Sequence, residues 1–457
     1  MTQLTEHKTT MMKAKTGVGI ALATATGALL GLAPTMSEAK GKVGEWDIDT
    51  AVLVYSESDS RVQAAEPVVN LTRNYDNDAK LNIKVVADTL TGASPNGATP
   101  SDEIQTFTRP SGSGNFTVAA KDQPLDDTFQ DTRGAATVTW SAPINRDWAY
   151  TAGTYGSIEY DYSSFGLNGS ISRYLNNKNT TLNFGLSGSM DTITPEGGLP
   201  TGLGRMPVPG NGKSDAAFDA EYASSRSGSD DSKTVVDVLF GVTQVINRQT
   251  IMQFNYGLSS VSGYMTDPFK VLSVIDDAQG ANYGGNLKGA DGNSIYLYEQ
   301  RPDTRTKHAL YWQTKYMLDN GDVVDGSYRF ATDDWGITSH TFDVRYRWAL
   351  GQQYLEPHVR YYMQSEADFY KRYLTATEYN GGSPIVKEAS ADYRLGELTG
   401  ITLGLKWGYQ LNEDQEISVR AEYMTQSNSG DQGFGKLANQ ELYPDTNAFW
   451  VQVGYSF

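Results

Sequence analysis

"NAFWVQVGYSF" (447–457) decides the fold, because the residues of this stretch alternate in polarity one by one. The apolar and aromatic positions are Phe449, Val451, Val453, Tyr455 and Phe457. The residues between them are mostly small or polar. Successive side chains of a strand point to opposite faces, so the pattern predicts a strand with a different solvent on each face.

The same alternation recurs along the chain in segments of about 10–14 residues that come in pairs. Connections are tiny within a pair, as at Asn320-Gly321, which predicts a type I′ hairpin. We count sixteen strands when 61–75 is included, although Pro67 weakens that strand. The long connections are 92–132, 192–233, 263–305, 368–397 and 428–446. The pattern predicts an all-β fold: a closed antiparallel transmembrane β-barrel with short periplasmic turns and long extracellular loops.

Composition agrees with export to a membrane and excludes several site classes. The 457 residues carry a formal net charge of −17, with 28 Tyr, 46 Gly and no Cys. A chain without cysteine has no disulfide framework, thiolate zinc site or catalytic thiol, and its acidity argues against nucleic-acid binding. The alternative folds are a soluble β-sandwich and a propeller. A sandwich packs one face of each sheet on the other and does not explain apolar faces on nearly every strand, and no blade-length repeat indicates a propeller.

The first 39 residues have the pattern of a cleaved secretory signal peptide. Lys8, Lys13 and Lys15 precede the apolar run 17–34, and small residues follow near Ala39. A membrane anchor is the alternative, but the run is short and rich in Ala, Gly and Thr. We therefore expect one outer-membrane barrel domain over 40–457, with 447–457 as its last strand.

The phase of the alternation assigns charged side chains to the lumen. In 341–350, Phe342 and Val344 share one face and Arg345 lies on the other. A charge facing lipid at mid-membrane costs about 2–4 kcal/mol. The same argument gives this set of lumen-lining residues: Asp47, Asp49, Glu66, Lys84, Asp88, Lys315, Asp325, Arg329, Asp343, Arg345, Arg347, Glu356, His358 and Arg360. It also places Asp237, Lys406, Arg420 and Glu422 inside.

The basic residues gather on consecutive strands between 323 and 366, and the first strands are more acidic. In a closed barrel this predicts a basic wall and an acidic wall, which focus the field on ions or polar solutes. Internal salt bridges that stiffen the barrel are the alternative reading. Pro67 and Pro357 each predict a β-bulge, with Glu66 and Glu356 facing inward.

One long outer connection contains an apolar stretch, "FKVLSVID" (269–276). It is a candidate constriction loop or plug, with Phe269, Lys270, Leu272, Ile275 and Asp276 as its residues. The alternative is a strand extension, or a loop that packs on its neighbours. The Asp/Gly/Asn-rich stretch 276–294 loosely suggests Ca²⁺, but it lacks the ligand spacing of a Ca²⁺ loop.

No catalytic or metal-ligand motif stands out. GxSxG and HExxH are absent from the sequence. His308, His340 and His358 lie on different strands, and a polar lumen residue is the simpler reading of each. We expect no cofactor, no metal and no enzymatic activity.

Several stretches, taken in order, resemble a bacterial family. They are "DTLTGASPNGA" (88–98), "VVDVLFGVTQVI" (235–246), "GYMTDPFKVLSVID" (263–276), "YLYEQRPDTRTKHAL" (296–310), "DDWGITSHTFDVRYRW" (333–348), "YLEPHVRYYMQSEADFY" (354–370), "SADYRLGEL" (390–398) and "VQVGYSF" (451–457). Together they resemble the domain of unknown function 3570 family. The resemblance implies an outer-membrane protein of diderm bacteria and supplies no activity or catalytic residues.

The sequence favours a porin-like channel or transporter for polar or charged solutes, because a 16-stranded barrel leaves an aqueous lumen unless it is plugged. The alternative is a scaffold that sheathes a periplasmic or extracellular partner such as a redox carrier, and a membrane-embedded enzyme is the weakest hypothesis. The expected partners are outer-membrane lipid, lipopolysaccharide and the barrel-assembly machinery. The last strand, with its terminal Phe457, resembles the signal that this machinery reads.

Overall fold

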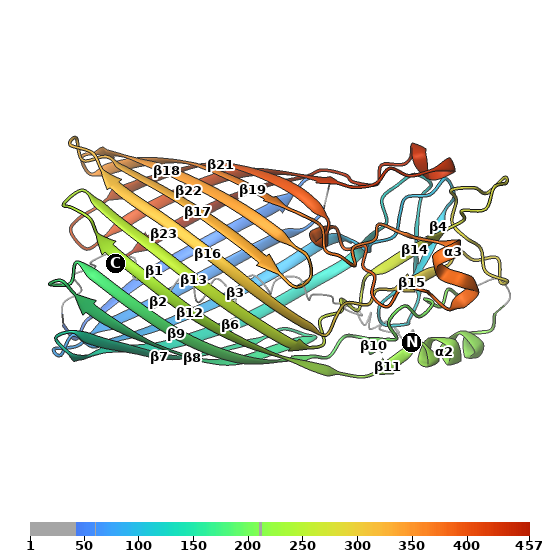
Figure 1. Ribbon diagram of the computed structural model, residues 1–457, viewed down its shortest axis with the longest axis horizontal. Coiled ribbons are helices and arrows are strands. Elements are labelled where there is room, and N and C mark those ends of the chain that lie inside the picture. Colours follow the sequence, from blue (N-terminus) through green and yellow to red (C-terminus); the bar gives the residue numbers. More distant parts are fainter. Residues whose placement is uncertain (1–42, 60, 210–212) are drawn as a thin grey trace, which may run out of the picture.

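The computed structural model describes residues 43–59, 61–209 and 213–457, so the signal peptide expected at 1–39 lies outside the described residues. Sixteen strands close into one antiparallel barrel, which confirms the predicted fold (Figure 1). In barrel order they are β1 (Trp46–Glu57), β2 (Gln63–Asn74), β3 (Lys80–Pro95), β6 (Leu125–Asn145), β7 (Trp148–Ile158), β8 (Tyr162–Leu175), β9 (Thr180–Ile193), β12 (Asp231–Val245), β13 (Thr250–Gly263), β16 (Thr304–Met317), β17 (Val323–Asp333), β18 (Thr338–Leu350), β19 (Gln353–Gln364), β21 (Glu397–Gln410), β22 (Glu416–Ser429) and β23 (Thr446–Ser456).

The last strand closes the barrel against the first. β23 pairs with β1 from Asp49↔Ser456 to Glu57↔Ala448, and Ile48 and Phe457 exchange two backbone hydrogen bonds of 2.7 and 2.8 Å. Phe449 and Phe457 are 49% and 44% exposed on the outer surface. The sheet therefore has no free edge, and its aromatic terminal residues face outward.

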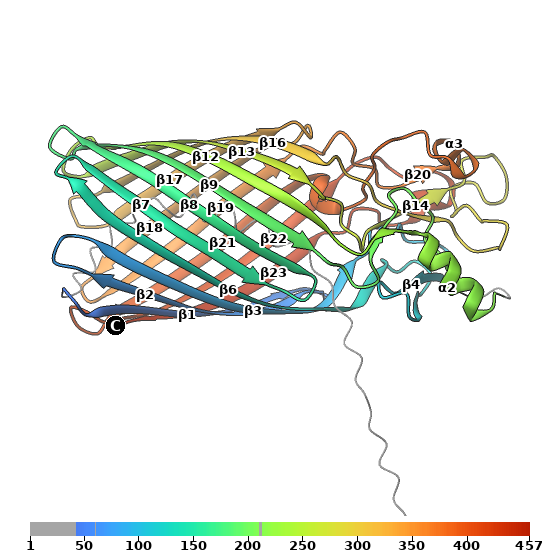
Figure 2. The ribbon, with the colours of Figure 1, turned by 90° about the horizontal axis from the view of Figure 1, so that it is seen from below.

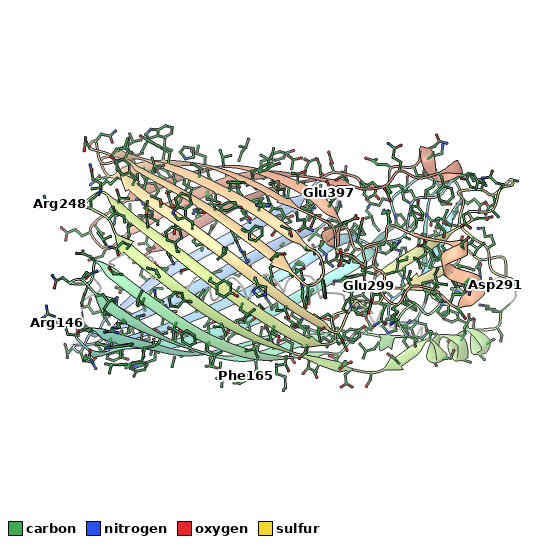
Figure 3. The ribbon with its side chains drawn as sticks, in the orientation of Figure 1. Arg146, Phe165, Arg248, Asp291, Glu299 and Glu397 are labelled. Carbon is green, nitrogen blue, oxygen red and sulfur yellow. The ribbon has the colours of Figure 1, made fainter. Side chains whose placement is uncertain are left out.

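The outer surface is apolar because alternate residues of every strand point away from the lumen. Phe165 shows this orientation at the rim of the ribbon in Figure 3 and is 58% exposed. Arg146 and Arg248 lie in the short turns at the opposite end from the long loops (Figure 3). No helix among the described residues is long and apolar enough to cross a membrane.

One predicted turn type is wrong. The hairpin between β16 and β17 has positive φ at Gly321 (87°) and not at Asn320, whereas a type I′ turn needs it at both central residues. Leu318 accepts from the Gly321 N–H at 3.0 Å and donates to Asp322 O at 2.8 Å. The connection is thus a longer turn that ends on a left-handed glycine.

The bulges predicted at the two prolines are also wrong. Pro67 pairs with Val52 of β1, and the register of β2 with β3 is the same on both sides of it. Pro357 pairs with Leu405 of β21, and the register with β18 is likewise unshifted. Each proline only interrupts the pairing on one side, since the missing N–H removes one ladder hydrogen bond and needs no extra residue. Register shifts occur instead at Gly92/Ser94 and Pro143/Asn145.

The long connections fold together into a cap over one end of the barrel (Figures 1 and 2). We define the cap as residues 96–124, 194–209, 213–230, 264–303, 365–396 and 430–445. Its elements are β4 (Gln105–Thr108), β5 (Asn115–Val118), β10 (Leu199–Pro200), α2 (Asp215–Ser224), β11 (Arg226–Gly228), β14 (Val271–Ile275), β15 (Tyr296–Tyr298), β20 (Leu374–Thr375), α3 (Ala376–Tyr379) and the 3-10 turns Asn380–Gly382, Tyr393–Leu395 and Gly435–Asn439.

The cap has a hydrophobic core of its own. β14 pairs antiparallel with β15 and parallel with β20, so residues about 100 positions apart share one small sheet. Leu272, Leu297 and Leu374, one from each strand, are fully buried against each other. The side chain of Arg372 donates to the carbonyls of Gly97, Ala98 and Leu442, tying three cap segments together.

Candidate functional site

Ion pairs occur along the lumen wall formed by β16–β19, β21 and β22. Lys315 lies 3.4 Å from Asp325 on the next strand, and Arg345 lies 3.5 Å from Asp343. Further along the wall, Arg420 is 3.6 Å from Glu422 and 3.9 Å from Glu356. Part of the predicted basic wall is therefore neutralised within the sheet.

His358 connects three strands across the inside of this wall. Its Nε2 lies 2.8 Å from Asp343 of β18 and its Nδ1 lies 2.9 Å from Glu422 of β22. The imidazole crosses β21 at Gly404, which pairs with His358 on one side and Glu422 on the other. A Cβ at Gly404 would lie 2.6 Å from Glu422 Oε1. Both ring nitrogens are occupied by carboxylates, so the histidine ties the strands together.

Other cations of the same wall have no such partner. Within the described residues, the side chains of Arg329, Arg360 and Lys307 form no hydrogen bond or ion pair, and Arg329 Nε is buried. Arg347 lies over the ring of Tyr354, 3.6 Å from its centroid. The wall thus combines neutralised pairs with cations whose charge remains available to a solute.

The opposite wall, on the first strands, is more acidic. Asn74 and Asn70 donate to Asp47 at 3.1 Å and to Asp49 at 3.2 Å. Asp88 is buried and pairs with Arg133 of β6 at 2.6 Å. Within the described part of the chain, the side chains of Glu66 and Lys84 form no hydrogen bond or ion pair.

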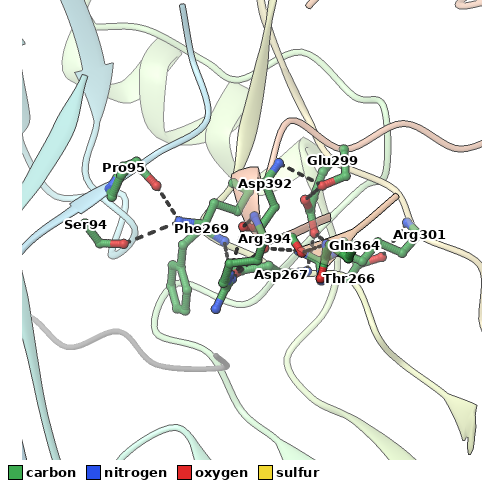
Figure 4. A network of polar contacts seen from close by, with 12 residues as sticks. Ser94, Pro95, Thr266, Asp267, Phe269, Glu299, Arg301, Gln364, Asp392 and Arg394 are labelled. Atoms are coloured by element: carbon green, nitrogen blue, oxygen red, sulfur yellow. Dashed lines mark hydrogen bonds and ion pairs between the residues drawn. The ribbon is translucent and has the colours of Figure 1, made fainter. Parts of the chain in front are cut away.

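A charged network lies at the mouth of the lumen, where the cap meets the barrel strands, and Figure 4 shows its contacts. Arg301 pairs with Glu299 at 2.5 Å and with Asp392 at 2.8 Å. Arg394 pairs with the same Asp392 at 2.6 Å and with Asp267 at 3.1 Å. The network joins cap segment 264–303 to segment 365–396.

Burial and charge act in opposite directions on the carboxyls of this network. Burial by itself raises the pKa of Asp392, but the neighbouring charges of Arg394 and Arg301 outweigh it and hold that pKa well below its usual range. Burial raises the pKa of Glu299, and the Arg301 charge opposes the rise without cancelling it. Asp392 is therefore the ionised centre that both arginines share.

Lys270 fastens the same cap segment to the barrel rim. Its Nζ donates to the carbonyl of Pro95, at the end of β3, and lies 3.4 Å from Ser94 Oγ. The side chain is 6% exposed, and burial lowers the pKa of its amine. The amine thus binds two oxygens at the place where β3 enters the cap.

Two cavities of unlike charge lie on either side of the mouth network. The larger, about 400 Å³, is lined by seven carboxylates and two cations: Glu57, Glu66, Asp88, Asp126, Asp131, Glu159, Asp267, Lys270 and Arg394. The smaller, about 220 Å³, is lined by five cations and three carboxylates: Lys233, Arg301, Arg305, Lys307, Arg394, Asp267, Asp333 and Asp392. Asp267 and Arg394 line both cavities, so the network is the partition between them.

The candidate constriction loop divides between this mouth and the cap interior. Phe269 and Lys270 line the larger cavity. Leu272 and Ile275 are 0% and 1% exposed inside the cap, and Asp276 accepts hydrogen bonds from Ala278 and Asn282 in its own loop. That the segment limits passage of solutes stays a prediction. No group of His, Asp and Glu among the described residues is arranged to hold a metal ion.

The family described as protein of unknown function (DUF3570) matches residues 19–457. The chain belongs to the DUF3570 family. Among curated proteins, none matches its sequence.

Solved structures resemble this DUF3570 protein at the level of the fold. OprB of Pseudomonas putida is 9% identical with a TM-score of 0.42, over 97% of this chain and 99% of that one. The CymD monoaromatic hydrocarbon channel is 7% identical with a TM-score of 0.38, over 92% and 89%. OpdK from Pseudomonas aeruginosa is 10% identical with a TM-score of 0.36, over 91% and 100%.

The sequence did not single out the mouth network, although it offered a signal. Its members lie in three of the stretches that carry the resemblance to the DUF3570 family: 263–276, 296–310 and 390–398. Asp267, Glu299 and Arg301 come from one loop and Asp392 and Arg394 from another, and only the folded cap brings the two loops within hydrogen-bond distance.

Proposed function

We propose that this protein is an outer-membrane channel or transporter for polar or charged solutes in a diderm bacterium. The observation that carries the proposal is the charged lumen, which leads at its mouth into two cavities of opposite charge. An interior that served only to stiffen a barrel would be expected to pair its charges, whereas Arg329, Arg360, Lys307 and Glu66 have no such partner among the described residues. Charges that face water in a pore are the usual source of ion selectivity.

In this proposal the cap narrows the entrance to the lumen, and the mouth network determines how tightly the cap is held in place. The cap has a buried hydrophobic core of its own, which supports a folded cover over the lumen. Breaking the network at Asp392 would remove the carboxylate that two arginines share. The apolar outer face, including Phe449, Val453 and Phe457, would contact lipid and lipopolysaccharide, and the last strand would be read by the barrel-assembly machinery.

Conductance of the purified full chain in planar bilayers tests the proposal. We expect discrete steps in KCl, and larger steps for Asp392→Asn because its cap is held less tightly. Asp291→Asn is the matched control, since Asp291 pairs with Arg205 at 2.8 Å in the cap, away from the mouth. Folded barrels of both the wild-type and Asp392→Asn that stay electrically silent would contradict a channel. A barrel that shows no conductance and retains a co-purifying protein in mild detergent would favour the alternative function, a scaffold that sheathes a partner protein.

A further inference from the structure

The smaller, basic cavity contains a cation that the fold leaves uncompensated. Lys307 of β16 lines this cavity, and the carboxylate whose negative charge attracts the Lys307 amine is Asp333. Asp333 is already held by Arg305, whose Nε donates to it at 3.0 Å. The side chain of Lys307 itself forms no hydrogen bond or ion pair within the described chain. A half-buried amine without a counter-charge is a site for an anion.

The other charges of this cavity are used within the protein. Arg301 and Arg394 bind Asp392, and Arg394 also binds Asp267. Lys233 lies 3.5 Å from Asp191. An incoming anion would therefore meet Lys307 without first displacing an existing ion pair.

A second unpartnered cation lies next to Lys307, on the side away from the cap. Lys307 also lines a small adjoining cavity of about 40 Å³ together with Arg329 of β17 and Tyr311. Arg329 Nε is buried and has no hydrogen-bond partner. Asp237 lines the same small cavity and accepts a hydrogen bond from the Ser187 hydroxyl at 3.1 Å, which leaves its charge in place. The two neighbouring cations outnumber this one carboxylate and favour one anionic group between them.

The uncharged part of the lining combines the polar residues Thr332, Ser339, Tyr362 and Gln364 with an apolar surface, and that surface limits the class of anion. Met265, Trp335, Ile337 and Leu395 line the same cavity and belong to one hydrophobic cluster. Inorganic phosphate gains nothing from such a surface and loses its hydration, whereas an aromatic or aliphatic body gains about 25 cal/mol for each Å² of apolar surface that it buries. A cavity of about 220 Å³ has room for a single-ring molecule.

We propose that this cavity is a binding site for small carboxylates with an apolar body, with Lys307 and Arg329 holding the carboxylate and the Trp335 side holding the body. The proposal deepens the channel function and rests on it only for the claim that the bound solute is in transit. Lys307 and Arg329 are the specificity-determining residues of the site.

Equilibrium dialysis of radiolabelled benzoate against the detergent-solubilised full chain tests the site without any need for conductance. We expect saturable binding at one site, and at least tenfold weaker binding of benzyl alcohol, which has the same body without the charge, and of inorganic phosphate, which has charge without the body. Lys307→Gln should weaken benzoate binding at least tenfold, and Lys307→Arg should largely preserve it. Lys84→Gln, a lumen cation on the acidic wall, should change nothing.

Arg329→Gln gives a second and independent variant if Lys307→Gln fails to form the barrel, and it should weaken benzoate binding several-fold. Absence of benzoate binding, or binding that both variants leave unchanged, would overturn the proposal. Equal binding of phosphate and benzoate would overturn the assignment to carboxylates with an apolar body. Benzoate binding without conductance in bilayers would refute the channel function but support the binding site. Conductance without benzoate binding would support the channel function and refute the binding site.

Discussion

Asp392 is the residue on which the mouth of the lumen depends most. It is 1% exposed and accepts from both Arg301 and Arg394. Asp392→Asn would leave two cations around a neutral amide, and loss of one partner from a buried ionic group costs about 3 kcal/mol. We expect the cap to become susceptible to limited proteolysis while the barrel stays resistant. Asp291→Asn removes a partly exposed partner of Arg205 and Lys213, and it should cost less, about 1 kcal/mol, and leave the cap resistant.

The same carboxyl gives the cap a defined acid limit. Because the arginines hold the pKa of Asp392 below its unfolded value of about 3.9, its contribution to stability is complete above pH 4. That contribution is lost as the pH falls from about 4 through the folded-state pKa. The pKa of Glu299 is raised in the folded cap, so protonation of Glu299 as the pH falls stabilises the cap and opposes the loss at Asp392. We expect the near-ultraviolet circular dichroism of the cap to be constant from pH 7 to 5 and to decline below about pH 4.

The Asp392→Asn variant is the control for this pH dependence. It should lose most of the decline between pH 4 and pH 3, since the titrating group is gone. An identical acid transition in the wild-type and in the variant would show that other carboxyls set the limit.

Gly404 is a residue whose importance lies in the side chain it lacks. A Cβ there would lie 2.6 Å from Glu422 Oε1 and 2.7 Å from Glu422 Cγ. Gly404→Ala should therefore push Glu422 away from His358 and destabilise the barrel by about 1–3 kcal/mol. Gly257→Ala, whose Cβ would meet open space, should cost little. Equal thermal unfolding of the two variants would contradict a role for Gly404 in the His358 contact.

At the scale of elements, each strand is defined by the two solvents on its faces. Val344, in the middle of β18, is 51% exposed on the outer face, and Ser327 of β17 points inward beside Asp343. Val344→Lys should destabilise the folded barrel by about 2–4 kcal/mol in lipid bilayers. Ser327→Lys, at almost the same depth along the barrel but on the lumen side, should change the stability of the barrel little. Urea unfolding in vesicles measures both, and equal costs would contradict the assignment of faces.

The alternation made the sixteen strands predictable, because the polarity of each side chain and its period of two can be read from the local sequence alone. The partners of the charged residues were not predictable in the same way. His358 meets Glu422 only because Gly404 lies between them in the register of three strands. At Pro67 and Pro357 a local rule predicted bulges, but the sheet keeps its register and gives up pairing on one side.

The cap was the part of the fold that sequence reasoning treated as loops. Its sheet pairs Val274 of β14 with Leu374 of β20, and no local period reveals a parallel pair of two residues between separate loops. The one local signal was the apolar stretch 269–276, whose residues Leu272 and Ile275 lie in the cap core. The mouth network depends on the same assembly, so its residues could not be grouped before the cap was known.

At the scale of the whole molecule, the barrel has an acidic side and a basic side that meet under the cap. The larger cavity lies against β1–β3, and the smaller one lies against β16–β19. The partition between them consists of cap residues Asp267 and Arg394 and not of barrel strands. A displacement of the cap would therefore merge the two cavities into one entrance, while a cap held in place would keep them separate.

A disulfide across the cap distinguishes these two states. Gln300 and Ala389 form an isolated antiparallel bridge with backbone hydrogen bonds of 3.0 and 2.9 Å, and such pairs have Cα atoms about 5.5 Å apart, within the range of a disulfide. The chain has no other cysteine, so Gln300→Cys with Ala389→Cys gives one defined bond between segments 264–303 and 365–396. We expect the oxidised form to conduct less than the wild-type and a reductant to restore conductance. Each single cysteine variant should behave as the wild-type under both conditions. Equal conductance before and after reduction would mean that solutes pass around a rigid cap, because the bond prevents these two segments from separating.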